Sequence, residues 1–235
     1  MKTHSGPFPP ASASECMRLD EELLTKAENG ESNARIYEWK GPSVSVPRSF
    51  SSDGVKNDVL QDAGIEFVKR PTGGGVLIHG FDLSYSVGVP RLGGWEHLGV
   101  DEAGLLIAQP VLETLIKCGF KAGFRPPLAP PNAPNPALCA IQKSPLDILI
   151  SGRKVAAFAQ RRTAKALFQH GSIHIRKIPE RVISAVKKAG LGTDLEWQLA
   201  GEAVAPLEEF EQVDVGRLKE VLMEAIRTAG GPGEG

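Results

Sequence analysis

The sequence has little net charge, few cysteines, few aromatic residues and no long apolar run. Its 27 lysine and arginine residues stand against 28 aspartate and glutamate residues, for a formal net charge of −1. Proteins that bind nucleic acid through a general electrostatic attraction carry a large positive field instead. No stretch approaches the roughly 20 apolar residues that cross a bilayer. We therefore expect no nucleic-acid partner and no membrane attachment.

The three cysteines, Cys16, Cys118 and Cys139, are widely spaced, and none belongs to a CxxC pair. This excludes a disulfide scaffold and a zinc knuckle. We expect Cys16 and Cys118 in the core. Cys139 is expected inside the proline-rich loop, where a thiol is more exposed than on a helix face and can act as a nucleophile if Lys154 or His79 supplies a cationic neighbour. His170 and His174 share one face of an expected strand, but two histidines without a third ligand predict no metal site.

The amino-terminal residues 1–13 are polar, rich in proline and serine, and lack the apolar centre of a signal peptide. We expect a disordered leader and a cytoplasmic protein. A single domain is expected over residues 14–229, with a flexible tail at 230–235. A domain of this length buries roughly 70% of its unfolded surface, so it needs neither metals nor disulfides for its core.

Helical and strand patterns follow one another irregularly along the chain. Helical spacing occurs at 14–27, 56–63, 101–118, 179–189 and 214–229. Strand patterns occur at 35–39, 43–46, 65–68, 76–79, 83–89, 146–150, 154–159 and 167–175. Residues 125–136 hold six prolines and are expected to form a loop. Without an internal repeat or a regular strand–helix alternation, the pattern predicts an α+β fold with a mixed, largely antiparallel sheet flanked by helices.

Three consecutive glycines, Gly73, Gly74 and Gly75, separate two of these strands and follow Arg70 and Thr72. A turn without side chains leaves backbone N–H groups open to a phosphate or carboxylate, and Arg70 can add a guanidinium to the same anion. A plain turn that needs a positive φ is an equally good interpretation. The pattern matches neither the P-loop nor the dinucleotide-binding fingerprint.

Lys154 opens a strand directly after the tight turn Ser151-Gly152. A lysine at this place can reach across a cleft and hold an acyl carbonyl or a phosphate. The simpler interpretation is a solvent-exposed hairpin lysine, since most lysines are exposed.

Several segments together resemble the biotin/lipoate protein ligase and transferase family. Arg70-Pro-Thr-Gly-Gly-Gly-Val-Leu-Ile-His79, followed by Asp82-Leu-Ser-Tyr-Ser86, resembles its lipoyl-binding loop. The segment 147–154, with 159–162 and 169–171, resembles its lysine hairpin, and 17–24 with 35–39 its opening helix and strand. The matching segments occur in the same order as in the family and cover roughly residues 14–185. Within the family, the sequence most resembles the cysteine-dependent octanoyltransferase branch.

This resemblance implies a class II synthetase-like catalytic domain that attaches an octanoyl or lipoyl group to a lysine. The acceptors would be lipoyl domains of 2-oxoacid dehydrogenases or the glycine cleavage H protein, and acyl carrier protein the donor. Cys139 stands fifteen residues before Lys154, where one transferase branch keeps its nucleophile, and the segment 139–145 resembles the surroundings of that cysteine. The resemblance thus implies a Cys139 thioester and no cofactor.

The same resemblance assigns the remaining site residues. Catalysis would rest on Cys139 and Lys154, the lysine binding the acyl carbonyl and the anion that develops on it. Substrate binding would fall to Arg70, Thr72, Gly73, Gly74, Gly75, His79, Asp147 and Ala159. An acyl tunnel is required, for which Val76, Leu77, Leu149 and Val155 are candidate walls. This chain carries Ala157-Phe158 where the family usually has glycine and a small polar residue, so Phe158 is expected to narrow the pocket or reshape the hairpin.

Three alternatives remain open. An ATP-dependent lipoate ligase would use ATP and Mg²⁺, with Lys154 and the glycine turn on the adenylate phosphate and Cys139 as a bystander. We expect only two helices in the last 60 residues. This is too little structure for the accessory domain of a two-domain ligase, which weakens the ligase alternative. Biotin ligation is a weaker alternative, because its glycine-rich motif carries further arginines. The last alternative is a degenerate family member without catalytic activity. The departure from the family pattern at Ala157-Phe158 favours it.

Overall fold

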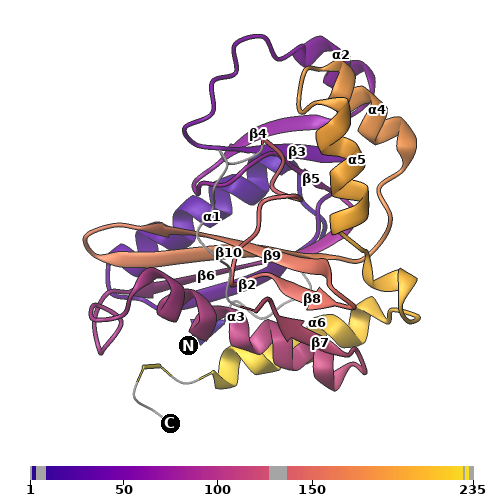
Figure 1. Cartoon of the computed structure of the whole chain (residues 1–235). Helices are drawn as coiled ribbons and strands as arrows, with labels where there is room; N and C mark the ends of the chain where they lie inside the picture. Colours follow the sequence, from indigo (N-terminus) through magenta and orange to yellow (C-terminus); the bar gives the residue numbers. More distant parts are fainter. Residues whose placement is uncertain (1, 4–8, 127–136, 230, 233–235) are drawn as a thin grey trace.

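The computed structural model describes residues 2–3, 9–126, 137–229 and 231–232, which form two β-sheets and the helices around them (Figure 1). The strands are β1 (Lys2–Thr3), β2 (Asn33–Tyr37), β3 (Ser43–Pro47), β4 (Glu66–Arg70), β5 (Leu77–His79), β6 (Asp82–Pro90), β7 (Ala122–Phe124), β8 (Ile148–Ile150), β9 (Arg153–Arg162) and β10 (Ala166–His174). The helices are α1 (Ala13–Glu28), α2 (Asn57–Asp62), α3 (Val100–Lys117), α4 (Glu180–Lys188), α5 (Asp194–Ala203), the 3-10 turn η1 (Leu207–Glu209) and α6 (Val215–Thr228).

The larger sheet has the strand order β1-β2-β6-β10-β9-β8-β7, and the smaller sheet the order β4-β3-β5. Each sheet contains one parallel pair, β1 with β2 and β3 with β4, and the other described pairs are antiparallel. The α+β fold with a mixed, largely antiparallel sheet is therefore confirmed.

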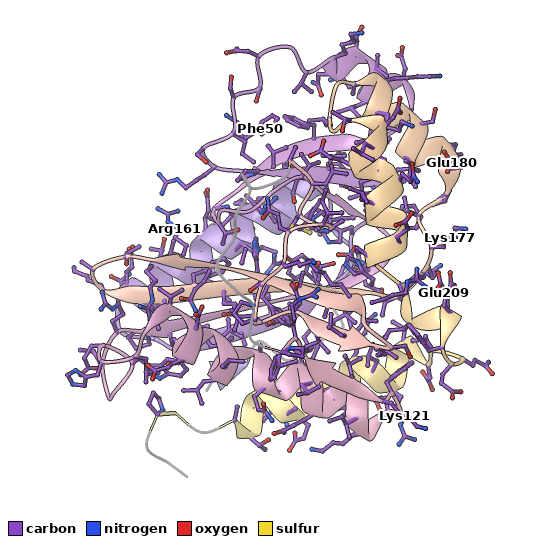
Figure 2. The ribbon with its side chains drawn as sticks, viewed as in Figure 1. Phe50, Lys121, Arg161, Lys177, Glu180 and Glu209 are labelled. Atoms are coloured by element: carbon purple, nitrogen blue, oxygen red, sulfur yellow. The ribbon has the colours of Figure 1, made fainter. Side chains whose placement is uncertain are left out.

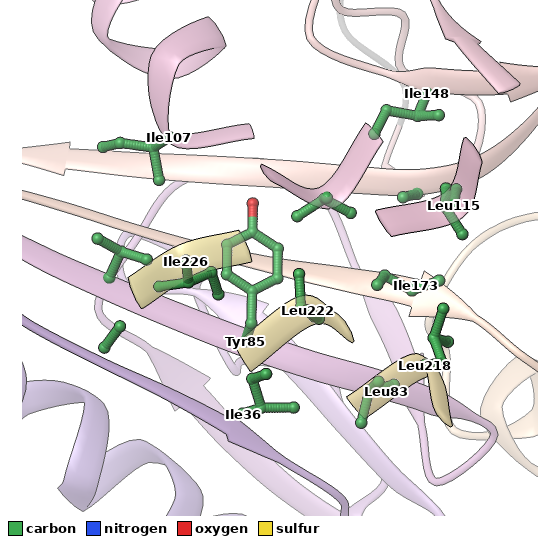
Figure 3. Close-up of a cluster of buried hydrophobic side chains, with 14 of the residues drawn as sticks. Ile36, Leu83, Tyr85, Ile107, Leu115, Ile148, Ile173, Leu218, Leu222 and Ile226 are labelled. Atoms are coloured by element: carbon green, nitrogen blue, oxygen red, sulfur yellow. The ribbon is translucent and has the colours of Figure 1, made fainter. Parts of the chain in front are cut away.

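One face of the larger sheet carries the main hydrophobic core. The alternation at 83–89 places Leu83, Tyr85, Val87 and Val89 on this face, where α3 and α6 cover them. Figure 3 shows Tyr85 among side chains from both helices. The opposite face of β6 and β10 carries polar side chains instead, and this asymmetry defines the side on which the site lies.

That opposite face is covered by α1 and by the smaller sheet. Leu23, Leu24 and Ala27 of α1 pack against Ala166 and Phe168 of β10. The far side of the smaller sheet is closed by α2, α4 and α5, which lie at the top of Figure 1. Polar residues of β6 and β10, namely Ser84, Ser86, His170 and Ser172, are therefore buried on this face.

The structure differs from the sequence prediction at several places. Ser12, not Ser14, caps α1, and its Oγ accepts a hydrogen bond from the Glu15 amide. The short strand β7 and the helix α5 were not expected, so the last 60 residues hold α4, α5 and α6 rather than two helices. No helix in the described parts of the chain is long and apolar enough to cross a membrane.

The expected leader is ordered where the structure describes it. Lys2–Thr3 pairs with β2, and the Ala11 amide donates a hydrogen bond to the Glu38 carbonyl. Residues 1 and 4–8 of the leader, 127–136 of the proline-rich loop, and 230 and 233–235 of the tail lie outside the described residues.

Candidate active site

A pocket lies between the two sheets, and we call it the inter-sheet pocket. Four residues expected at the site line it: Arg70, His79, Cys139 and Ala159. The remaining lining residues are Met17, Tyr37, Trp39, Ser45, Leu77, Ser84, Ala157, Phe158, His170, Gly171 and Ser172. The topology thus gathers residues from α1, both sheets and the 137–142 segment around the partly buried Cys139 thiol.

The segment that carries Cys139 is held against the glycine turn by backbone hydrogen bonds. The Val76 amide donates to the Ala137 carbonyl at 2.8 Å, and the Cys139 amide donates to the Val76 carbonyl at 3.1 Å. A Cβ atom on Gly75 would lie 2.4 Å from the Ala137 oxygen and 2.5 Å from the Cys139 nitrogen. Gly75 is therefore required because the cysteine segment runs directly over it.

The other two glycines have different surroundings. Gly74 has φ +95°, and a Cβ there would lie 2.9 Å from Arg70 Nη2 and 3.7 Å from Cys139 Sγ. Gly73 has open space around it. The turn thus combines a positive φ at Gly74 with close approach at Gly75, which supports the interpretation as a structural turn.

The sequence suggested that Arg70 binds an anion at the glycine turn. In the structure its guanidinium binds backbone carbonyl groups instead. Its Nη2 donates to the carbonyl oxygens of Gly73 and Gly75 at 2.7 and 2.6 Å, and its Nη1 to the Ser45 carbonyl at 3.0 Å. The side chain is buried, and burial lowers its pKa, while the neighbouring Cys139 acts in the opposite direction. Arg70 therefore shapes the glycine turn and brings a positive charge to the sulfur.

Lys154 is buried, not a solvent-exposed hairpin lysine. Its Nζ donates to the carbonyls of Cys139 and Gln142 at 3.2 and 2.5 Å and forms an ion pair with Asp147 Oδ1 at 3.2 Å. Asp147 also pairs with Arg125. The lysine and Asp147 thus lie behind the 139–142 turn and hold it in place, and neither lines the inter-sheet pocket among the described residues.

A β-bulge in β9 turns the Lys154 side chain toward the 139–142 turn. Leu149 pairs with Lys154 and Ile148 with Ala156, which leaves Val155 as an extra residue on β9. Val155 and Ala156 both pack in the main core, so the bulge reverses the alternation and sends Lys154 to the opposite face. Of the four expected tunnel walls, only Leu77 lines the inter-sheet pocket among the described residues, and Val155 belongs to the core.

His79 forms part of a buried chain of hydrogen bonds along one side of the pocket. Its Nδ1 lies 2.8 Å from Asp82 Oδ2 and its Nε2 2.8 Å from Ser45 Oγ, while the ring stacks on Trp39 at 4.0 Å. Burial alone would raise the pKa of Asp82, but His79 and Ser172 outweigh it and hold this pKa at about 2. Both ring nitrogens of His79 have partners, so the ring is fixed in orientation.

A second series of hydrogen bonds lies on the other side of the pocket, and the sequence analysis did not predict it. His170 Nδ1 is 3.0 Å from Asp20 Oδ2, and His170 Nε2 is 2.7 Å from Thr72 Oγ1. Burial lowers the pKa of His170 against the opposing effect of Asp20. Arg35 and His170 lower the pKa of Asp20 despite its burial. The neutral ring therefore donates from Nδ1 to Asp20 and accepts the Thr72 hydroxyl proton at Nε2.

The Phe158 ring does not project into the gap between the sheets. Phe158 pairs with Gly171 across β9 and β10, and its ring packs edge-on against Tyr85 on the face covered by α3 and α6. A Cβ on Gly171 would lie 2.4 Å from the Phe158 ring. The large ring at 158 is therefore accommodated by glycine at 171, while the methyl groups of Ala157 and Ala159 face the pocket, since side chains alternate along β9.

The other cysteines and histidines lie outside the reacting centre. Burial raises the pKa of the Cys16 thiol to about 12. Cys118 is half-buried after α3. His174 lies outside the inter-sheet pocket, and within the described ranges no cluster of three or more histidine, cysteine or acidic residues has the geometry to hold a metal ion.

Comparison with known proteins agrees with this combination of fold and pocket. The structure superposes on lipoate-protein ligase A bound with ATP with a TM-score of 0.70 and 18% identity, over 92% of this chain and 80% of the other. A bipartite archaeal lipoate protein ligase from Thermoplasma acidophilum gives a TM-score of 0.68 at 19% identity, over 93% and 80% of the two chains. The fold is therefore that of the lipoate-protein ligases.

The family follows from the sequence comparison. The model of the lipoyl protein ligase A/B catalytic domain matches residues 12–227, and the chain belongs to this family. Octanoyltransferase LipM from Anoxybacillus flavithermus is 32% identical over 179 residues, which is 73% of this chain and 64% of that protein. LipM from Carboxydothermus hydrogenoformans is 31% identical over 183 residues, 75% and 66% of the two chains. The chain thus spans just under two thirds of the length of these relatives.

Proposed function

We propose that this protein transfers an octanoyl or lipoyl group to the lysine of a lipoyl domain through a thioester on Cys139. The observation that carries the proposal is the position of Cys139, whose thiol lies in the inter-sheet pocket on a segment clamped between the glycine turn and Lys154. Relatives named octanoyltransferase over most of this chain support the same reaction. Residues 14–229 act as one catalytic domain.

The reaction proceeds in two acyl transfers. The Cys139 thiolate attacks the carbonyl carbon of a donor thioester; a new C–S bond forms, the donor C–S bond breaks, and the donor thiolate takes up a proton. The acceptor lysine amine then attacks the Cys139 thioester; a C–N bond forms, the amine loses a proton, and the Cys139 thiolate is released. Two such steps replace one difficult transfer, and no cofactor enters the balance.

Each neighbouring residue has a role in this scheme. The guanidinium of Arg70 holds the glycine turn over which the cysteine segment runs. Lys154 and Asp147 fix the cysteine segment from behind and thereby position the thiol in the pocket, rather than contacting the acyl carbonyl as the family resemblance implied. His79, held by its hydrogen-bond chain, borders the acyl group, and Ala159 gives that group room. Thr72 acts through His170, whose ring it holds at the pocket wall.

Apolar side chains at the pocket would stabilise an acyl chain that lies against them. Trp39, Leu77 and Ala157 give it apolar contact, and each methylene buried contributes about 0.8 kcal/mol. We propose acyl carrier protein as the donor, and lipoyl domains of 2-oxoacid dehydrogenases or the glycine cleavage H protein as the acceptors.

An ATP-dependent lipoate ligase is the second candidate, because a structure with the same fold binds ATP. In that reaction ATP and Mg²⁺ would activate the free acid, Lys154 would hold the adenylate phosphate, and Cys139 would not react. The two candidates therefore differ in their need for ATP and for the thiol.

Intact-protein mass spectrometry of an apo lipoyl domain separates them. One reaction contains octanoyl-acyl carrier protein without ATP, and the other contains free octanoate or lipoate with ATP and Mg²⁺. The proposal predicts modification in the first reaction, lost with Cys139→Ser and kept with the matched control Cys118→Ser. Modification only in the second reaction would establish the ligase, and modification in neither would point to a non-catalytic family member.

A further inference from the structure

The helix α5 has no assigned part in the proposed transfer, although both of its ends contact residues of the site. Its first turn binds the start of the segment that carries Cys139, and its last residues lie against the strand of Lys154. Figure 1 shows α5 running from the level of the smaller sheet toward β9. The helix therefore connects two parts of the site that are separate in the sequence.

Glu196, in the first turn of α5, uses its two carboxylate oxygens for two different contacts. Oε2 accepts hydrogen bonds from the Thr193 amide at 2.9 Å and the Thr193 hydroxyl at 3.0 Å, which caps the helix. Oε1 accepts a hydrogen bond from the Ala137 amide at 2.7 Å, two residues before Cys139. One side chain thus joins the start of α5 to the start of the cysteine segment.

These contacts hold the Glu196 carboxylate in its charged form. Burial alone would raise its pKa, but hydrogen bonds from the amides of Thr193, Ala137 and Leu138 outweigh burial and lower the pKa of Glu196. A charged acceptor forms a stronger hydrogen bond than a neutral one. The bond to the Ala137 amide is therefore stronger than a bond to a neutral side chain would be.

Apolar packing supports the same junction. Leu138, directly before Cys139, is buried and packs in one cluster with Leu191 and Trp197. A Cβ atom on Gly192 would lie 2.8 Å from Leu138 Cδ2 and 2.8 Å from Trp197 Nε1, so the chain at the start of α5 approaches Leu138 closely. The indole of Trp197 is fixed by a hydrogen bond to the Leu191 carbonyl at 2.9 Å. The start of α5 thus provides a fitted seat for the residue that precedes the nucleophile.

The other end of α5 is fastened to the strand of Lys154. Val204 forms a parallel bridge with Lys154, and the Ala205 amide donates to the Lys154 carbonyl at 2.9 Å. Arg153 donates to the Val204 carbonyl at 2.6 Å and pairs with Glu209, which Figure 2 shows at the edge of the molecule below α5. The helix is therefore anchored at both ends, as a brace must be.

We propose that α5 braces the nucleophile and that Glu196 is a positioning residue for acyl transfer. The glycine turn binds the Ala137 carbonyl and the Cys139 amide, whereas Glu196 binds the amides of Ala137 and Leu138, so the two sets of contacts complement one another. Among the described residues Glu196 does not line the inter-sheet pocket, so it acts through the backbone. This inference rests on the proposed transferase function, in which the thiol must stand about 3 to 3.5 Å from the carbon that it attacks.

Hydrogen exchange on the full chain tests the brace without any chemistry. Glu196→Ala removes both sets of hydrogen bonds, and we expect the Cys139 amide, which donates to the Val76 carbonyl, to exchange about tenfold faster. Glu102→Ala is the matched control, because Glu102 accepts a hydrogen bond from the Gly99 amide at 2.8 Å at the start of α3. We expect it to loosen the start of α3 and to leave exchange at Cys139 unchanged. A role of Glu196 in capping alone would raise exchange within α5 only.

The rate of octanoyl transfer to Cys139 tests the consequence, with octanoyl-acyl carrier protein as donor and mass spectrometry as the readout. We expect Glu196→Ala to lower kcat by about tenfold and to leave KM for the donor unchanged, since the carboxylate does not touch the donor. Glu196→Gln keeps one acceptor oxygen, which can serve Thr193 or Ala137 but not both, so its rate should be intermediate. Glu102→Ala should transfer at the full rate.

Failure of the brace and failure of the proposed function give different results. Unchanged exchange at Cys139 in Glu196→Ala, an equal change in Glu102→Ala, or transfer by Glu196→Ala at the full rate would each overturn the proposal. An unaltered protein that forms no octanoyl adduct would instead contradict the transferase function. The exchange experiment needs no donor, so it still decides whether Glu196 holds the cysteine segment.

Discussion

The backbone of Cys139 lies directly over Gly75, so that a Cβ atom on the glycine would fall 2.5 Å from the cysteine amide nitrogen. The parallel bridge between Val76 and Leu138 fixes this contact. The glycine turn thereby positions the nucleophile, and three features that are far apart in the sequence, the turn, the cysteine and Lys154, form one unit.

Gly75→Ala is expected to displace the cysteine segment. Main-chain atoms surround the new methyl group and have little freedom to move, so we expect a cost of about 2 kcal/mol in the free energy of unfolding and at least a tenfold loss of transfer. Gly73→Ala is the matched control, because open space surrounds Gly73. Urea unfolding and the transfer assay measure both effects. Equal behaviour of the two variants would show that the close approach at Gly75 does not matter.

Lys154→Met is expected to destabilise the protein by about 3 kcal/mol, since it leaves Asp147 and two carbonyl groups without their buried cation. Transfer should also be lost, because the segment of Cys139 is released. A double-mutant cycle with Asp147→Asn measures the pair directly, and we expect a coupling of more than about 1 kcal/mol. Additive effects would mean that the ion pair does not hold this turn.

Gly171→Ala should be strongly destabilising, because the new methyl group would overlap the Phe158 ring and lie 2.5 Å from the ring of Tyr85. Removing the Phe158 ring relieves the clash with that side chain. We therefore expect the double variant Phe158→Ala/Gly171→Ala to be more stable in thermal unfolding than Gly171→Ala alone. If the double variant is no more stable than Gly171→Ala, the Phe158 side chain does not pack on Gly171 and lies elsewhere, for example in the acyl pocket.

Stability is expected to fall as the pH decreases below about 6.5. Burial lowers the pKa of His174 to about 4, so the folded protein keeps this ring neutral while the unfolded chain binds a proton. Burial also lowers the pKa of His170, so this ring contributes to the same pH dependence. The stability contributed by the neutral rings is thus complete above the unfolded pKa of about 6.5 and decreases between pH 6.5 and 4.

Urea unfolding between pH 7.5 and 4.5 measures this dependence. His174→Gln removes one of the two groups and should flatten the curve by on the order of 2 kcal/mol over this range. His97→Gln is the matched control, because the His97 side chain is 82% exposed. A slope that both variants leave unchanged would contradict the assignment of this pH dependence to His174.

The sequence predicted much of the fold because its long elements have clear periods. The alternation over 83–89 and the apolar spacing of α1, α3 and α6 correspond to the observed strand and helices. The strand β7 has three residues, too few to show a period. The helix α5 carries exposed Leu195 and Leu199, which obscure its amphipathic pattern.

The site was less accessible to sequence analysis, since its contacts join distant segments. Arg70, His79, Cys139 and Ala159, which the family resemblance named as site residues, line one pocket, and their roles stay predictions. The burial of Lys154 depends on the bulge at Val155, which leaves no pattern in the sequence. The pairing of His170 with Asp20 spans 150 residues, and the only local signal was a polar side chain in a buried strand.

The central claim is that Cys139 carries the acyl group between donor and acceptor. The most direct test is to mix the protein with octanoyl-acyl carrier protein, without ATP or acceptor, and to locate any octanoyl group by intact and peptide mass spectrometry. We predict one octanoyl group per chain, on Cys139, that passes to an apo lipoyl domain when the domain is added. An unmodified Cys139, with a lipoyl domain that nevertheless becomes octanoylated at full rate by the Cys139→Ser variant, would contradict the thioester mechanism.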